Sequence, residues 1–196
     1  MEMWYKSLGS SYKFNDLLQS GNNKQLKAMR RRYKRELYAQ RVAWIKECMP
    51  HACIGVDVIV GFPGETHDDF LETYRFIQDL DVSYLHVFTY SERANTPAAM
   101  MDGIVPLGER RDRNEMLRIL SEKKKRAFYE PFQGQVRAVL FEHAREEGMV
   151  SGFTDNYLKI EMPGSDDLIN QMAQVELLEL LPSGQFRAKL SQKVLV

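Results

Sequence analysis

The sequence contains few residues that ligate metals, with two cysteines and four histidines among 196 residues. Cys48 and Cys53 have four residues between them, a spacing that matches neither a zinc knuckle nor a redox Cys-x-x-Cys pair. The histidines show no ligand spacing either. We therefore expect no metal bound to this chain, and two free structural thiols, one closing a helix and one opening a strand.

Long apolar runs and an excess of one charge are also absent. No apolar run approaches the roughly 20 residues that span a bilayer, and Met1–Ser10 lacks the apolar core of a signal peptide. We expect no membrane partner and a cytoplasmic location. The 27 basic and 27 acidic side chains cancel, so no overall field attracts nucleic acid or a membrane surface.

Charge and residue pattern divide the chain at Glu130-Pro131. Residues 131–196 hold six basic and nine acidic side chains, a net charge of −3, which leaves +3 on residues 1–130. The pattern is helix-like before this point and strand-like after it. We predict one domain over 17–130 and a second over 131–196, with 1–16 as an unassigned N-terminal segment.

One segment, Gly55 to Glu65, predicts a strand, a loop and the start of a helix. Its apolar run is typical of a strand that is buried on both faces of a parallel sheet. Thr66 is expected to cap an amphipathic helix, with Asp69 three residues on. Ligands in such folds meet the loops at the carboxyl ends of the strands, where Gly61 to Glu65 lie. The apolar face of the predicted helix comprises Phe70, Leu71, Tyr74 and Ile77.

The rest of the first domain alternates strands and helices, which implies parallel βαβ crossovers. A short strand is predicted to end near 17–20, and a helix over 24–47 has apolar residues near a spacing of 3.6. Strands over 54–60 and 83–89 follow, and then a helix over 107–129. The apolar positions of the 24–47 helix are Leu26, Met29, Tyr33, Leu37 and Trp44.

The second domain has a strand pattern. Short runs over 135–141, 156–162, 174–181 and 185–190 are separated by glycine-containing turns. About five such strands predict a small antiparallel barrel of the OB-like kind. The expected fold class is therefore α/β, a partial (βα) barrel followed by a small antiparallel β-barrel.

Several motifs, taken in order, resemble those of the radical SAM methylthiotransferases, enzymes that put a methylthio group on tRNA or on a ribosomal protein. The motifs are Leu18–Gly21, Met29–Tyr33, Asp57–Thr66, His86–Arg93 with Thr96 and Ala98, and a C-terminal part similar to the TRAM RNA-binding domain. The resemblance covers roughly residues 17–190. Gly152–Tyr157 is most similar to the branch that acts on threonylcarbamoyladenosine beside the anticodon of tRNA.

The resemblance implies an enzyme that uses S-adenosylmethionine and [4Fe-4S] clusters on a tRNA substrate. The family holds its radical cluster on a Cys-x-x-x-Cys-x-x-Cys loop, and a second cluster on three further cysteines. This chain has neither set. We therefore expect a truncated member that covers the C-terminal half of the radical SAM barrel and the TRAM domain, is inactive alone and binds none of these cofactors.

The resemblance assigns cofactor-binding residues to two loops at the predicted ligand face. For S-adenosylmethionine these are Gln19, Ser20, Gly61, Pro63, Gly64 and Glu65. Simpler alternatives stay open: a turn in which Gly21 supplies a positive φ, and a Glu65 that helps to cap the next helix. No catalytic residue is assigned.

Substrate and RNA contacts are predicted in three places. Arg30, Arg31 and Arg32 lie in a basic run on the predicted 24–47 helix. They are expected to contact tRNA phosphate or to form a salt bridge with bound cofactor, or else to be a solvated helix face. Ser91 and Arg93 border the predicted substrate opening, where arginine suits a carboxylate. In the C-terminal domain the candidates are Phe153, Tyr157 and Arg187, or these aromatic residues belong to the core.

Two other readings of the chain compete with the enzyme fragment. One is a non-catalytic module that binds tRNA or a protein partner, and the other is an unrelated α/β domain with similar packing. A half barrel also leaves two open sheet edges, which invite pairing with another chain. A homodimer or strand exchange is therefore a further prediction.

Overall fold

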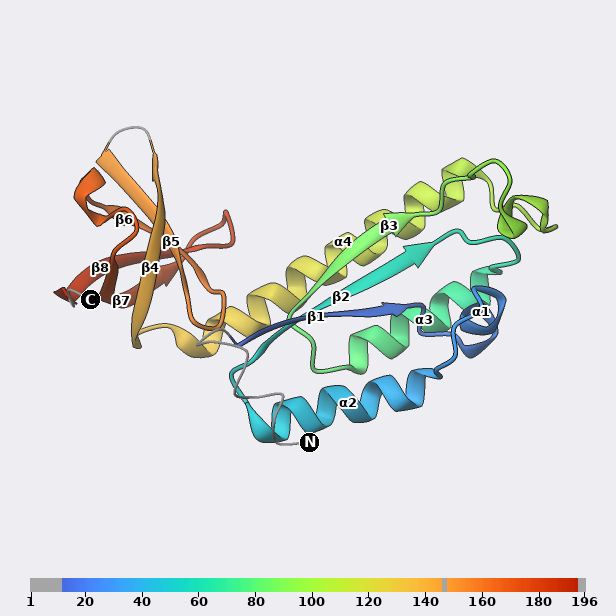
Figure 1. Cartoon of the computed structure of the whole chain (residues 1–196), viewed down its shortest axis with the longest axis horizontal. Coiled ribbons are helices and arrows are strands. Elements are labelled where there is room, and N and C mark those ends of the chain that lie inside the picture. The colour runs from blue at the N-terminus through green and yellow to red at the C-terminus, as the bar shows by residue number, and fades with distance from the viewer. Residues whose placement is uncertain (1–11, 146–147, 194–196) are drawn as a thin grey trace. The chain divides into compact units, whose positions relative to one another are not determined.

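The computed structural model describes residues 12–145 and 148–193 (Figure 1). Most of the predicted N-terminal segment, residues 1–11, lies outside the described residues. The chain forms two compact units. One comprises Phe14–Lys124, and the other comprises Tyr12 and Lys13 together with the described residues from Lys125 onward.

The first unit contains a three-stranded parallel sheet with the order β1-β2-β3. β2 and β3 pair in parallel from Gly55 opposite Tyr84 to Val60 opposite Thr89, and all three arrows point the same way in Figure 1. This confirms the predicted fold class. The strands are β1 (Lys13–Gln19), β2 (Cys53–Val60) and β3 (Tyr84–Thr89).

Four α-helices accompany this sheet, and α2, α3 and α4 share one core with it. Tyr38 and Val42 of α2, Phe70 and Ile77 of α3, and Leu117 of α4 are all buried against apolar residues of the strands. The helices are α1 (Asn23–Ala28), α2 (Arg35–Cys48), α3 (His67–Asp79) and α4 (Leu107–Tyr129). No helix among the residues described is long and apolar enough to cross a membrane.

The residues at the start of α3 form the predicted capping motif. The Thr66 side chain accepts a hydrogen bond from the Asp69 N–H, and the Asp69 side chain accepts one from the Thr66 N–H. This capping box satisfies two backbone donors that the helix itself leaves free. Phe70 and Ile77 of the predicted apolar face are fully buried.

The predicted helix over 24–47 is wrong, because α1 ends before the basic run. The Arg31 N–H donates to Leu26 O and the Arg30 N–H donates to Lys27 O, the two bonds of a Schellman motif. Arg30 occupies the left-handed position of this motif with a φ of 57°. Glycine is the usual residue there, so the sequence contains no ordinary stop signal.

The break changes which side chains face the core. Leu37 and Trp44, two of the predicted apolar positions, are 42% and 46% exposed, whereas Tyr38 and Val42 are buried. The basic residues 30–32 consequently lie in a turn between α1 and α2 and not on a helix. Tyr33 anchors that turn to β1 by donating a hydrogen bond to Leu17 O at 2.6 Å.

The second unit is a closed barrel with the strand order β4-β5-β6-β8-β7. Its core is a cluster of apolar side chains that includes Phe141, Leu158 and Phe186. One of its pairings, β6 with β8, is parallel, and the other four are antiparallel. The strands are β4 (Val136–Arg145), β5 (Met149–Thr154), β6 (Lys159–Pro163), β7 (Met172–Leu180) and β8 (Phe186–Lys193).

The strand β5 has no counterpart among the predicted runs, because its glycine was interpreted as part of a turn. Gly152 lies in the middle of β5, opposite Phe141 of β4. A Cβ at Gly152 would lie 2.1 Å from Leu140 O, so the two strands can approach only if this residue lacks a side chain. The register of β4 shifts next to this point, between Phe141 and His143.

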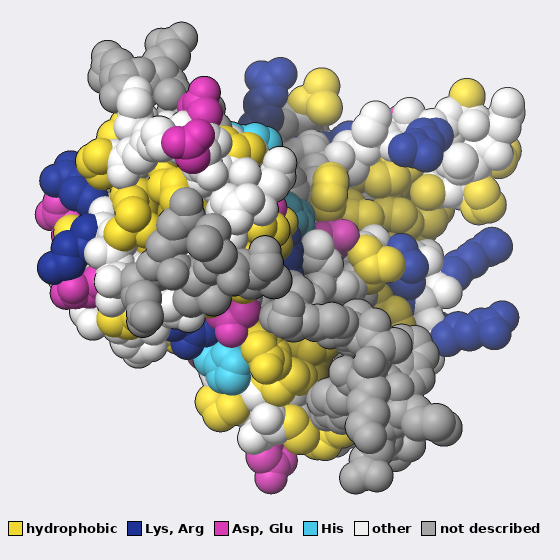
Figure 2. Space-filling view, turned by 60° about the vertical axis from the view of Figure 1, so that its left-hand side comes forward, with side chains coloured by type: hydrophobic (Ala, Val, Ile, Leu, Met, Phe, Trp, Pro, Cys, Tyr) yellow, Lys and Arg dark blue, Asp and Glu magenta, His cyan; other side chains and the backbone are white. Residues whose placement is uncertain are grey.

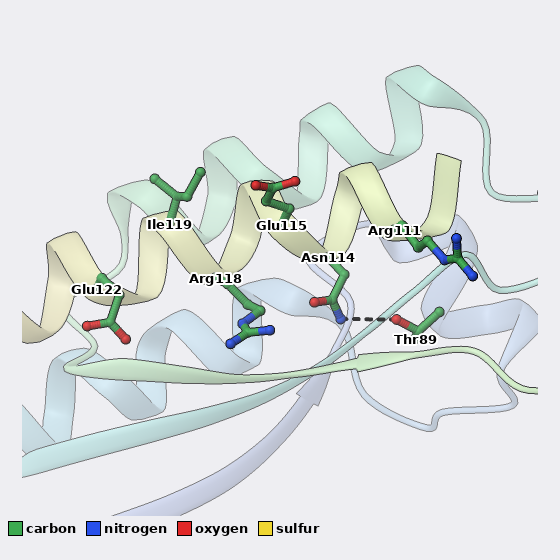
Figure 3. Close-up of a pocket in the computed structure, with 7 residues that line it drawn as sticks. All are labelled: Thr89, Arg111, Asn114, Glu115, Arg118, Ile119 and Glu122. Carbon is green, nitrogen blue, oxygen red and sulfur yellow. Dashed lines mark hydrogen bonds between the residues drawn. The ribbon is translucent and has the colours of Figure 1, made fainter. Parts of the chain in front are cut away.

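The outer edge of β3 is covered by side chains of α4. The Ser121 hydroxyl accepts from the Leu85 N–H at 2.8 Å and donates to Leu85 O at 3.2 Å. Asn114 donates to Thr89 Oγ1 at 3.0 Å (Figure 3) and to Val87 O at 3.4 Å. An edge that the sequence predicts to be open therefore has some of its backbone groups occupied.

Replacing Arg30 with glycine is expected to stabilise the first unit. Glycine adopts the left-handed conformation without the steric cost that arginine bears, so the free energy of unfolding should rise by about 1 kcal/mol. Urea denaturation followed by circular dichroism measures this change. A loss of stability would mean that the Arg30 side chain contributes more to the fold than its backbone conformation costs.

Candidate functional site

A cavity of about 620 Å³ lies at the carboxyl ends of the three parallel strands. Gln19 ends β1, and Ile59 lies near the end of β2. Phe62 is the second residue after β2, and Tyr90 directly follows β3. The end of α1 and the segment after Thr96 complete its walls. The remaining lining residues are Lys27, Ala28, Met29, Arg30, Arg31, Thr96, Pro97, Ala98 and Met101.

The cavity presents aromatic surface, and one of its aromatic residues carries a buried polar group without a partner among the described residues. The rings of Phe62 and Tyr90 meet edge to face, with centroids 5.3 Å apart. The Tyr90 hydroxyl is buried and has no hydrogen-bond partner among the described residues. A buried hydroxyl without a partner is costly, so a ligand that supplies one would gain from it. Aromatic walls with a few convergent polar groups are typical of sites for small planar ligands.

The charged residues that line the cavity are all basic. They are Lys27, Arg30 and Arg31, which come from the last turn of α1 and the Schellman turn. Arg31 donates a hydrogen bond to Gln19 Oε1 at 3.0 Å, which ties this turn to the end of β1. An anionic group in the cavity would therefore meet cations and no carboxylate from the lining residues.

The loop between β2 and α3 is held by a buried ion pair. Glu65 Oε2 accepts from the Gly61 N–H and from Arg113, each at 2.7 Å, and the Glu65 side chain is 1% exposed. Burial raises the pKa of Glu65, although hydrogen bonds from Gly61 and Arg113 act in the opposite direction. Glu65 does not cap α3, because Thr66 does, and Glu65 Oε1 has no partner among the described residues.

A second arginine of α4 holds the chain segment that follows β3. Arg110 is 1% exposed and donates to Val105 O at 2.7 Å and to Tyr90 O at 2.9 Å, while it also pairs with Glu92. A Cβ at Gly61 would lie 2.4 Å from Arg110 Cγ, so Gly61 is required by this close approach as well as by its φ of 76°. The sequence gives no signal for Arg110 or Arg113, which resemble ordinary surface charges of a helix.

The structure brings only some of the predicted cofactor residues to the cavity. Gln19 lines it, and Gln19, not Gly21, has the positive φ, 66°. Ser20 is fully buried and hydrogen-bonded to Thr73 Oγ1 at 3.1 Å. The predicted loop residues do not line it, although Phe62 of the same loop does: they are Gly61, Pro63, Gly64 and Glu65.

Of the predicted substrate residues of the first unit, too, only some line the cavity. Arg30 and Arg31 line the cavity, and Arg32 does not. Ser91 and Arg93 are exposed on the segment after β3 and do not line the cavity either. Phe62, Tyr90 and Lys27, by contrast, line it without having been predicted, although the first two lie inside the motifs that carry the resemblance.

The predicted RNA-binding residues of the barrel have partners within the second unit. Phe153 stacks on Tyr157 with ring centroids 4.6 Å apart, and the Lys13 ammonium lies 3.5 Å from the centre of the Tyr157 ring. Arg187 pairs with Glu179 at 2.7 Å across β7 and β8. Figure 2 shows basic, acidic and apolar side chains interspersed on the face in view. Contact of these residues with RNA stays a prediction.

The cysteines do not fit an iron-sulfur cluster at this site. Cys48 is exposed at the end of α2, and Cys53 is buried at the amino end of β2, whereas the cavity lies at the carboxyl ends of the strands. Among the residues that the structure describes, no group of three or more His, Cys, Asp or Glu side chains could hold a metal.

Comparison with known proteins assigns the chain to a family. Residues 15–77 match the model of the Radical SAM superfamily. The chain is 39% identical over 166 residues to threonylcarbamoyladenosine tRNA methylthiotransferase MtaB of Bacillus subtilis, which covers 83% of this chain and 37% of that protein. It is 40% identical over 152 residues to MtaB of Aquifex aeolicus, covering 77% of this chain and 36% of that protein.

A relative with a different name is almost as similar. The tRNA-2-methylthio-N(6)-dimethylallyladenosine synthase of Protochlamydia amoebophila is 36% identical over 162 residues, which cover 82% of this chain and 36% of that protein. These matches define a radical SAM protein. More narrowly, the chain belongs to the radical SAM methylthiotransferase family, as its motifs predicted, and it spans a little over a third of the length of these curated relatives.

Replacing Arg113 with methionine is expected to destabilise the first unit by about 3 kcal/mol at pH 7, because Glu65 would stay buried without its counter-ion. This loss of stability should become smaller as the pH is lowered. The pKa of Glu65 is already raised above its unfolded value and would rise further without Arg113, so the folded state gains stability as pH falls through that pKa. Urea denaturation between pH 7 and pH 4.5 measures this.

The control for this prediction is the double variant Glu65→Gln, Arg113→Met. It has no carboxylate at position 65, so its stability should not show the recovery at low pH that the single variant shows. A recovery of equal size in both variants would assign the pH dependence to another group.

Proposed function

We propose that the cavity of the first unit binds an adenosine derivative as part of a tRNA methylthiotransferase. The observation that carries this proposal is the unpartnered, buried Tyr90 hydroxyl beside the edge-to-face pair with Phe62. A purine has a flat apolar face for the rings and ring nitrogens that accept a hydrogen bond from a hydroxyl. Both molecules that the family handles, S-adenosylmethionine and a tRNA adenosine, contain this group.

The names of the relatives support the reaction class. They act on tRNA adenosines that already bear an N6 substituent, and the first two are named for threonylcarbamoyladenosine. We therefore propose methylthio transfer to such an adenosine next to the anticodon, in a protein that contains this chain. S-adenosylmethionine would supply the radical, and Gln19, Phe62 and Tyr90 would hold its adenosine or that of the tRNA.

For the chain by itself we propose binding without chemistry. Its two cysteines lie apart and away from the cavity, so the residues present cannot supply three thiolates to a [4Fe-4S] cluster. The competing function is a tRNA- or partner-binding module that never takes part in catalysis. A reading frame with Cys-x-x-x-Cys-x-x-Cys directly upstream of this sequence would favour the enzyme, and its absence would favour the module.

The purified chain should bind S-adenosylmethionine, S-adenosylhomocysteine or adenosine, as measured by isothermal titration calorimetry. Tyr90→Phe removes the hydroxyl and keeps the ring, so affinity should fall about fivefold, the scale of one neutral hydrogen bond. Tyr74→Phe on α3 is the matched control and should leave binding unchanged. If none of the three ligands binds the wild-type chain at millimolar concentration, the proposed adenosine site is wrong.

Binding of tRNA should be weak and sensitive to salt. If Arg30, Arg31 and Arg32 contact phosphates, the triple alanine variant should lower the slope of log affinity against log salt by about 0.7 to 0.9 for each lost contact. The matched control removes three exposed arginines elsewhere in the first unit, with Arg41, Arg75 and Arg118 changed to alanine. Equal losses in the two variants, measured by filter binding, would indicate a general charge effect and no specific surface.

A further inference from the structure

Two cations of the cavity lack an ion pair. Lys27 and Arg30 both line it, and no salt bridge joins either of them to a carboxylate among the described residues. The third cation, Arg31, already donates to Gln19. No aspartate or glutamate contributes to the cavity wall. Two positive charges therefore face a partly enclosed space without a counter-charge from the protein.

The position of Arg30 adds an independent observation. Its backbone occupies the left-handed site of the Schellman turn, which favours glycine. An arginine in this conformation places a long cationic side chain at the cavity wall at a cost to the fold. Strained residues of this kind are common where a ligand is held. Arginine also presents a planar fork of donors that matches a carboxylate.

We propose that Lys27 and Arg30 form a carboxylate subsite of the cavity, which recognises an acidic N6 substituent on the bound adenosine. This inference rests on the proposed adenosine site. The two kinds of relative differ in this group, because a threonylcarbamoyl substituent ends in a carboxylate and a dimethylallyl substituent is apolar. The subsite would therefore decide which adenosine the protein accepts.

Carboxylate recognition is thereby assigned to Lys27 and Arg30, and no longer to Arg93, the residue predicted from the sequence. That residue does not line the cavity, whereas Lys27 and Arg30 do. Lys27 in the last turn of α1 and Arg30 in the turn that follows it both line the cavity, and we propose that one carboxylate contacts both. The methionine part of S-adenosylmethionine also carries a carboxylate, and the experiment must separate these two sources.

The test compares free ligands on the purified chain by calorimetry. The first arm uses N6-threonylcarbamoyladenosine, its methyl ester and N6-dimethylallyladenosine. The second arm uses S-adenosylmethionine and 5′-methylthioadenosine, which lacks the carboxylate. The wild-type chain should bind the free acid about tenfold more tightly than the ester, the scale of one charge-assisted hydrogen bond. It should bind the dimethylallyl compound no better than the ester.

The variants Lys27→Ala and Arg30→Gly should lose most of this preference and bind the ester as before. Because Arg30→Gly is expected to fold more stably than the wild type, a loss in that variant cannot be attributed to unfolding. Arg41→Ala, which removes an exposed charge from α2, is the control and should keep the preference.

Three outcomes overturn the subsite. Equal affinity for acid and ester overturns it while leaving the adenosine site intact, and so does a preference that both variants retain. A loss confined to the second arm would assign these cations to the cofactor's carboxylate and overturn the role in substrate choice. If no adenosine ligand binds in either arm, the proposed function itself fails, and that result is distinct from the other three.

Discussion

The ion pair between Glu65 and Arg113 is the contact on which the ligand face depends. It joins the loop after β2 to α4 inside the protein, where both side chains are almost fully excluded from water. A charge buried in this way is tolerated only when its partner is fixed, so the pair requires the loop and the helix to keep one relative position. Phe62 lies within that loop, and Arg110, one helical turn before Arg113, holds the segment that begins with Tyr90. The aromatic floor of the cavity follows from these two arginines.

Much of the fold was predictable, because the relevant signals are local. Thr66 and Asp69 specify the start of α3, and the apolar run of β2 specifies a strand buried in a parallel sheet. The errors arose where a residue is used against its usual preference. Arg30 ends α1 in a position that glycine normally fills, and Gly152 lies within a strand because the neighbouring backbone leaves no room for a Cβ. Both choices depend on tertiary contacts that no periodicity reveals.

The candidate site was predictable only to the level of its loops. The sequence places Gln19 and the residues from Gly61 to Glu65 at the carboxyl ends of strands, and the cavity lies there. Which side chains point into the cavity depends on the turn after α1 and on the arginines of α4. Glu65 shows the limit most clearly, because its ion pair with an arginine 48 positions away leaves no trace in the sequence pattern.

The α4 side chains that cover the β3 edge make the two edges of the sheet unequal as places where a further strand could pair. With Ser121 occupying both backbone groups of Leu85, an added strand would have to displace α4 before it could pair on that side. The side of β1 has no such requirement from α4, because β1 lies at the opposite end of the strand order. Ser121 thus hinders the pairing of a further strand, from this chain or another, with the β3 edge at Leu85, and it does not hinder pairing at the β1 edge.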